Sequence, residues 1–150
     1  EGLASVPRSP ELEFSKIRIN QVCKNIAEGN ALQLIAESGG EAVGTIGVWI
    51  NWKHRHGGLG YHLDAPARGK GIASRMLQGL LDHCFDQIGL HRIWADTFVD
   101  NEPSRRLLER NGFSFEGVKR QAYLKEDQYL DTDMWAMLAT APRTWKEQTS

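Results

Sequence analysis

The hydrophobic and polar positions of the chain divide it into helical and extended segments. Ahead of Gly29, apolar residues recur on one helical face, which predicts a helix over residues 10–28. A wide apolar stripe at helical spacing predicts a longer helix over residues 72–88. A third, shorter helix is expected within residues 101–112, because a proline lies near its start and a glycine follows its end.

Several runs rich in β-branched and aromatic residues predict strands. They are residues 32–38, 42–52, 58–63, 91–99, 113–124 and 128–138. The pair Gly39 and Gly40, between the first two runs, indicates a hairpin. The order of these elements predicts an α/β (α+β) fold, a mixed sheet of six to seven strands flanked by helices, in a single domain over residues 1–150.

The charge and cysteine content narrow the classes of partner. The chain has 18 Lys and Arg against 19 Asp and Glu, a formal net charge of −1, so neither a nucleic-acid footprint nor a membrane-surface patch is present. No apolar run approaches the length of a membrane span. Cys23 and Cys84 stand far apart without the spacing of metal ligands. They predict two buried, reduced thiols in a cytoplasmic protein, and no metal.

The stretch "APARGKGIASRM", residues 65–76, lies between a predicted strand and the long helix. Gly69 and Gly71 let the backbone approach a ligand closely, and Arg68 and Lys70 add positive charge. Next to a helix N-terminus, these features predict an anion site suited to phosphate. The spacing is not that of a Walker loop, and Ser74 replaces the third glycine of a dinucleotide fingerprint. A glycine-rich turn with solvated basic residues is the alternative.

The wider pattern resembles one enzyme family. "RGKGIA" fits the Arg/Gln-x-x-Gly-x-Gly/Ala signature of the GNAT superfamily of N-acetyltransferases, with Arg68, Gly71 and Ala73 on its fixed positions. "NEPSRRLLERNGFSFEG", residues 101–117, resembles a segment of the ribosomal-protein alanine N-acetyltransferase branch, the RimJ/RimL type. "GYHL" before the loop and Asp131 in the last strand also fit that branch.

This resemblance implies acetyl-CoA as the cofactor. Its pyrophosphate would lie on the backbone amides of residues 69–73, helped by Arg68. The strand before the loop would splay from residues 91–99, and the pantetheine arm would pair with backbone near Leu63. Asn101 would contact the cofactor and Ser104 would lie near its sulfur, although both residue types are also common helix caps. The implied cofactor-binding residues are Leu63, Arg68, Gly69, Lys70, Gly71, Ile72, Ala73, Asn101 and Ser104.

The candidate catalytic residues are Ser104, Tyr123 and His62. Ser104 is the first choice for assisting the departing thiolate. A phenol such as that of Tyr123, where related enzymes often carry Glu, can donate a proton but is no ready base at neutral pH. His62 has an imidazole, which can act as a base if it faces the cleft. Related enzymes also carry a Glu where this chain has Gly58, so that general base is missing.

The acceptor expected from the resemblance is a primary amine, either a protein N-terminus or a small molecule. A CoA-binding or regulatory module without catalysis is the alternative of a different class, and a nucleotide-binding domain comes third. Family members usually have a strand and a helix ahead of residues 10–28, and we expect both to be missing from this sequence. Their absence would leave the sheet with an unpaired edge near residues 32–38, which predicts a homodimer.

Overall fold

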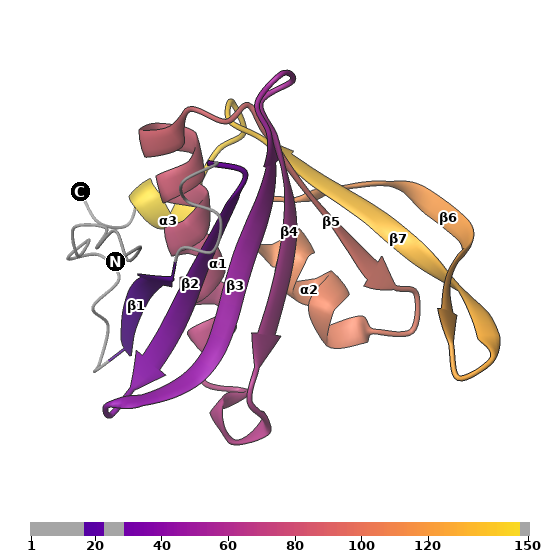
Figure 1. The fold of residues 1–150 in the computed structure, drawn as a ribbon, viewed down its shortest axis with the longest axis horizontal. Coiled ribbons are helices and arrows are strands. Elements are labelled where there is room, and N and C mark those ends of the chain that lie inside the picture. Colours follow the sequence, from indigo (N-terminus) through magenta and orange to yellow (C-terminus); the bar gives the residue numbers. More distant parts are fainter. Residues whose placement is uncertain (1–16, 23–28, 148–150) are drawn as a thin grey trace.

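The computed structural model describes residues 17–22 and 29–147. They form a seven-stranded sheet in the order β1-β2-β3-β4-β5-β7-β6, with helices packed on one face (Figure 1). The strands are β1 Ile17–Val22, β2 Ala31–Ser38, β3 Glu41–Asn51, β4 His56–Leu63, β5 Arg92–Phe98, β6 Ser114–Lys125 and β7 Gln128–Leu138. The helices are α1 Ile72–Asp82, which continues as a π-helical turn over His83–Ile88, α2 Glu102–Arg110 and the short α3 Thr144–Glu147.

All neighbouring strands pair antiparallel except β4 and β5, which are parallel. The pairing of β4 with β5 covers only His56 to Gly58 against Arg92 to Trp94. Beyond Gly58 the two strands separate, as Figure 1 shows. The splay expected from the sequence is therefore confirmed, and it leaves backbone groups of β4 without a strand partner on that side.

The core lies between the sheet and the helices. The helical stripe of α1 is buried through Met76, Leu77, Leu80 and Leu81, none of which is measurably exposed. Strands contribute alternate residues to the same core, as the burial of every second residue of β2 illustrates. The predicted strands, the two predicted helices after residue 64 and the hairpin at Gly39 and Gly40 are confirmed.

The predicted helix over residues 10–28 is wrong where it can be compared. Ile17–Val22 is a strand that pairs antiparallel with β2 from Ser38 to Gln33. Apolar and polar residues alternate over the first four residues of "IRINQV", so the two-residue period and the open edge of β2 prevail over the helical pattern. The remaining residues of that prediction, and Cys23, lie outside the described part of the chain.

The predicted absence of a strand ahead of β2 is therefore also wrong. Because β1 covers the edge near residues 32–38, the homodimer expected from an unpaired edge there loses its physical reason.

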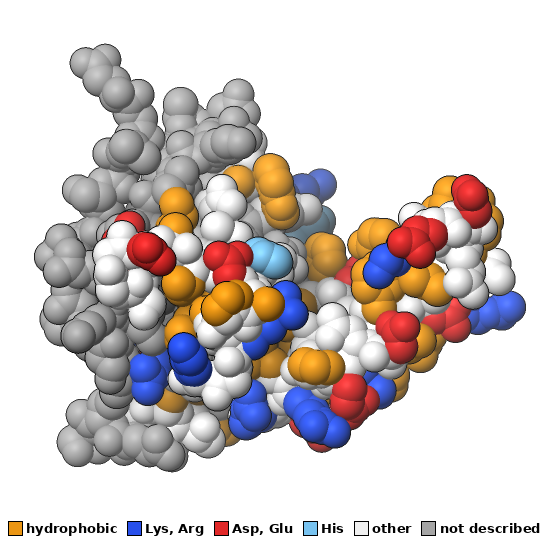
Figure 2. All heavy atoms as spheres, turned by 90° about the horizontal axis from the view of Figure 1, so that it is seen from below, with side chains coloured by type: hydrophobic (Ala, Val, Ile, Leu, Met, Phe, Trp, Pro, Cys, Tyr) orange, Lys and Arg blue, Asp and Glu red, His pale blue; other side chains and the backbone are white. Residues whose placement is uncertain are grey.

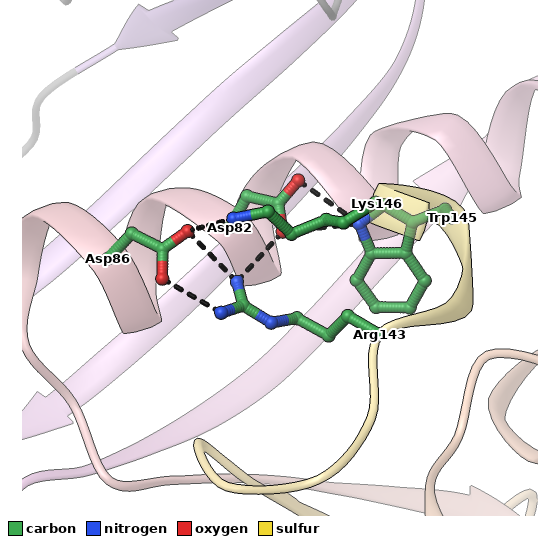
Figure 3. A network of polar contacts seen from close by, with 5 residues as sticks. All are labelled: Asp82, Asp86, Arg143, Trp145 and Lys146. Carbon is green, nitrogen blue, oxygen red and sulfur yellow. Dashed lines mark hydrogen bonds and ion pairs between the residues drawn. The ribbon is translucent and has the colours of Figure 1, made fainter. Parts of the chain in front are cut away.

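A cluster of polar contacts fixes the C-terminal segment to the main helix (Figure 3). Arg143 donates to Asp82 at 2.9 Å and to both carboxylate oxygens of Asp86 at 2.8 and 3.0 Å. The indole N–H of Trp145 donates to Asp82 at 3.0 Å, and Lys146 lies 2.7 Å from Asp86. This arrangement, termed here the C-terminal clamp, holds α3 against α1.

The clamp gives its two carboxylates opposite pKa shifts. Hydrogen bonds from Arg143 hold the pKa of Asp86 at about 2, below the ordinary 3.8. Burial raises the pKa of Asp82, although hydrogen bonds from Trp145 and the charges of its basic neighbours offset part of that rise.

The one cysteine among the described residues is buried. Burial raises the pKa of the Cys84 thiol to about 12, so this thiol is protonated and unreactive at neutral pH. Within the described residues, no helix has the length and apolar character needed to cross a membrane.

Arg143→Ala should lower the free energy of unfolding by about 1–2 kcal/mol at pH 7, because it leaves Asp86 without its main donor and removes one of the donors to Asp82. Arg143→Lys should lose less, since it keeps the charge but not the paired donors. The folded pKa of Asp86 is depressed, so its stabilisation is present above about pH 4 and is lost as pH falls toward 2. Urea unfolding of the two variants and the parent should show the stability difference shrinking over that interval. A difference independent of pH would contradict this account.

Candidate functional site

A cavity of about 440 Å³ opens where β4 ends, between the loop that follows it, the start of α1 and the α2 helix. Its lining residues are Tyr61, His62, Leu63, Arg68, Gly69, Gly71, Ile72, Ala73, Ser74, Asn101, Pro103, Ser104, Leu107 and Arg110. Most of the cofactor-binding residues predicted from the sequence are thus gathered around one cavity. Lys70 belongs to the same loop but does not line it.

The loop provides a cradle for an anion. Gly69 and Gly71 have φ angles of 78° and 76°, which favour glycine, and a Cβ atom built on either would meet no atom within 4 Å. Gly71 caps α1 with no side-chain hydrogen bond, so the first N–H groups of that helix are available toward the cavity. Figure 2, which looks onto this end of the molecule, shows Lys and Arg side chains gathered along it. The site therefore suits a phosphate-bearing ligand.

Arg68 has a structural contact in addition to its place in the lining. Its Nε donates to the backbone oxygen of Leu63 at 3.0 Å, which ties the loop to the end of β4. The resemblance implies that Leu63 contacts the cofactor's pantetheine arm and that Arg68 contacts its phosphates. In the structure the Leu63 carbonyl already accepts from Arg68, while the remaining guanidinium nitrogens keep their charge for a ligand.

A half-buried pair of hydroxyl groups lies in the same cavity. The Tyr61 hydroxyl and the Ser104 hydroxyl are hydrogen-bonded, and Asn101 caps α2 by accepting from the Ser104 backbone N–H at 3.3 Å. Burial raises the pKa of Tyr61, and the bond to Ser104 offsets part of that rise. The pair is therefore neutral at pH 7 and can supply an O–H donor. Asn101 and Ser104 act as a cap and line the cavity at once.

One buried amide joins the two helices that form the cavity walls. The Asn111 side chain donates to Ser74 at 3.2 Å and to the Leu107 carbonyl at 2.9 Å, and it accepts from Gln78 at 2.9 Å. Because Ser74 and Gln78 lie on α1 whereas Leu107 lies on α2, Asn111 fixes the distance between the helices. It is 4% exposed, so loss of these bonds would leave buried polar groups unpaired.

The position of the missing general base is filled by a neighbouring ring. A Cβ atom on Gly58 would lie 2.6 Å from the Trp94 ring. The indole of Trp94 therefore occupies the space into which a side chain at position 58 would project. Two residues further along β4, a Cβ atom on Gly60 would meet no atom within 4 Å, so the same face is open there.

The other two catalytic candidates lie apart from the hydroxyl pair. The side chain of His62 is 65% exposed, and its Nε2 lies 3.2 Å from Asp64. By strand alternation it shares the face of Gly58 and Gly60, opposite Tyr61. Tyr123, on β6, is 47% exposed and donates to Asp96 at 3.2 Å, and it is not among the cavity residues.

Sequence reasoning missed Tyr61, Ser74 and Arg110 as cavity residues. Tyr61 could have been found, because alternation along β4 groups it with the core residues Leu59 and Leu63 rather than with His62. Arg110 required the relative placement of α1 and α2. In the part of the chain that the structure describes, no group of three or more His, Cys, Asp or Glu side chains is placed to hold a metal ion.

Comparisons with known proteins agree with this site. Residues 5–113 match the acetyltransferase (GNAT) family. An uncharacterized N-acetyltransferase of Bacillus subtilis is 36% identical over 65% of this chain and 56% of its own length. The ribosomal-protein-serine acetyltransferase of Escherichia coli is 38% identical over 53% of this chain and 45% of its own length. The chain thus spans about half the length of these curated relatives.

A solved structure supports the same fold. Mycobacterium smegmatis RimJ, in complex with CoA-disulfide, superposes with a TM-score of 0.72 and 32% identity over 77% of this chain and 56% of that one.

Gly58→Ala should destabilise the fold by about 1–3 kcal/mol, because the new methyl group meets the Trp94 ring. Gly60→Ala is the matched control on the same strand and should change stability by about 0.5 kcal/mol or less, since its methyl group enters open space. Trp94→Leu should relieve most of the Gly58→Ala penalty in a double-mutant cycle measured by urea unfolding. Equal effects of the two alanine variants would show that the ring does not fill position 58.

Proposed function

We propose that this chain, which belongs to the acetyltransferase (GNAT) family, transfers the acetyl group of acetyl-CoA to a primary amine. The observation that carries the proposal is the cavity in which a glycine loop at a helix N-terminus and a neutral hydroxyl pair meet beside separated strands. A phosphate cradle and a proton donor in one cavity suit the two ends of an acyl-thioester carrier. The cytoplasmic location expected from the sequence stays a prediction.

The residues present fit the cofactor. The loop amides of residues 69–73 and the guanidinium groups of Arg68 and Arg110 would hold its phosphates. The unpaired edge of β4 beyond Gly58 offers backbone groups to an extended chain. When bound, acetyl-CoA supplies the acetyl group as a thioester. Lys70 remains in the proposal as a nearby charge that raises the local potential.

The hydroxyl pair gives the site a proton donor. Ser104 is held by the cap at the start of α2, and Tyr61 orients its hydroxyl. Because burial keeps the Tyr61 phenol protonated, the pair can donate one hydrogen bond to a developing negative charge on sulfur or oxygen. Tyr123 lies on another strand and is proposed below to serve the acceptor instead.

Removal of the amine's proton has no dedicated base at position 58. His62 lies on the face of the sheet opposite the described helices, near the end of β4, and is solvent-exposed. We propose that it accepts the proton through water. His62→Ala would then flatten the acid limb of the pH–rate profile.

A catalytically weak CoA-binding module is the second candidate, and one observation favours it: the Trp94 ring fills the space of the usual base. Release of CoA thiol from acetyl-CoA, measured with a panel of primary amines, separates the two functions. Amine-dependent thiol release supports the transferase. Acetyl-CoA binding without such release would support the binding module.

Arg68→Glu should weaken acetyl-CoA binding by about 1.5–3 kcal/mol, because it sets a negative charge against phosphate and releases the Leu63 carbonyl. Lys53→Glu makes the same charge change in the turn at the far end of β4 and serves as the control. Calorimetric titration should show a loss for Arg68→Glu alone. Unchanged affinity in that variant would contradict the phosphate role of the loop.

Ser104→Ala and Tyr61→Phe should each lower kcat by about 100-fold or less, with little change in acetyl-CoA affinity, because both remove a member of the donor pair. The double variant should cost little more than either single one, since the pair acts as a unit. Steady-state kinetics with calorimetry tests this. Full turnover in both single variants would mean that catalysis relies on positioning and backbone groups.

A further inference from the structure

We propose that the face of the sheet opposite the described helices carries an acceptor site in which Asp96 holds the ammonium group beside the Trp94 ring and above Gly60. We further infer that this site favours amines that also bear an anionic group over polyamines. The inference rests on the proposed function and names the substrate class of that site.

The Asp96 carboxylate has one oxygen that could accept a hydrogen bond from a further cation. It is 10% exposed and its Oδ2 is 3.0 Å from Lys119 Nζ and 3.2 Å from the Tyr123 hydroxyl. Its Oδ1 is buried and has no hydrogen-bond partner. A buried carboxylate oxygen without a donor is costly, and an incoming ammonium would supply the missing bond.

The space beside Asp96 is open where the strands separate. Pairing between β4 and β5 ends at Gly58 and Trp94, and Asp96 is the next residue of β5 on the same face as Trp94. Across the split, position 60 of β4 has open space where a side chain would be. Figure 2 shows a notch between the body of the sheet and the projecting hairpin of β6 and β7. The cofactor cavity lies beyond the same split, at the end of β4.

This face already accommodates an ammonium group. Lys119 Nζ lies 5.5 Å from the centroid of the Trp94 ring while it contacts Asp96. A ring face and a carboxylate together are the surroundings that a primary ammonium prefers. The acceptor would use the same two groups, the Trp94 ring face and the Asp96 carboxylate.

A bulge in β6 brings the partners of Asp96 together. Lys119 pairs with Thr132 and Tyr123 with Leu130, so four steps along β6 match two along β7. The extra residues of β6 form a bulge at Gln121, where φ is 50°. The backbone N–H of Gln121 donates to the Asp131 carboxylate at 2.7 Å. The bulge thus sets an ammonium and a phenol side by side against one carboxylate.

The charges around Asp96 determine which class of amine the acceptor site prefers. Lys119 contacts the carboxylate, and Lys125 Nζ lies 5.4 Å from the Phe98 ring, which itself packs edge-on against Tyr123. Lys119 already balances the charge of Asp96, and Lys125, held over Phe98 two residues further along β5, adds positive charge beyond the amine position. A second ammonium on the acceptor would meet this positive charge, whereas a carboxylate would be attracted to it.

Steady-state kinetics with saturating acetyl-CoA should compare 3-aminopropanoate, propylamine and spermidine. We expect kcat/KM to fall in that order. Asp96→Asn should raise the KM for 3-aminopropanoate by about tenfold or more and leave the calorimetric Kd of acetyl-CoA unchanged, because the lost contact is made to the acceptor alone. Gly60→Leu should raise the same KM by closing the open space. Asp127→Asn, in the exposed β6–β7 turn, makes the identical substitution where φ is 62° and should change neither quantity.

An unchanged KM in Asp96→Asn, or spermidine as the best acceptor, would overturn the inference. If the parent protein acetylates none of these amines, the proposed function fails, and the site is tested alone by titrating 3-aminopropanoate while following the Trp94 indole signal by NMR. A shift of that signal that Asp96→Asn abolishes would support the site. No shift in the parent protein would overturn it.

Discussion

The separation of β4 from β5 after three residue pairs is the constraint on which the rest of the site depends. A continuous sheet would leave no passage from one face to the other, because neighbouring paired strands lie only about 4.8 Å apart. Once the strands part, the unpaired edge of β4 faces an opening, with the glycine loop and α2 on the helix side and Asp96 on the other. A thioester on one side can then be reached by an amine from the opposite side.

The small residues of β4 determine how this opening is used. The Trp94 ring occupies the space that a side chain at Gly58 would need, so β4 cannot carry a base at that position. The space beside Gly60 is empty. In the proposed function, proton donation on the helix side therefore falls to a neutral pair, whose phenol is kept protonated by burial. On the opposite face, Lys119 and Tyr123 contact the Asp96 carboxylate, which would take the ammonium group of the acceptor. The two faces thus have separate chemical tasks.

The parts of the fold set by local sequence were predictable. The loop of residues 65–71 and the helix after it follow from glycine, basic residues and a 3.6-residue period, and all three are short-range signals. Ile17–Val22 was misread because a two-residue alternation lay inside a helical pattern, and only its pairing with β2 decides between them. The contacts of Asp96 with Lys119 and Tyr123 were beyond sequence reasoning, because they depend on a bulge that shifts the register of β6 against β7.

The rigidity of the cofactor side follows from contacts that meet no ligand. Asn111 joins α1 to α2 through three hydrogen bonds, and the C-terminal clamp fixes the far end of α1. The loop amides lie at the start of α1, and Ser104 lies in the first turn of α2. These contacts between and beside the helices therefore fix the positions of both ends of the cavity. On the acceptor side, β6 is an edge strand that is mostly exposed, and the side chains of Lys119 and Tyr123 tie it to Asp96 of β5. The acceptor side thus depends on side-chain contacts between strands, whereas the cofactor side depends on contacts between its helices.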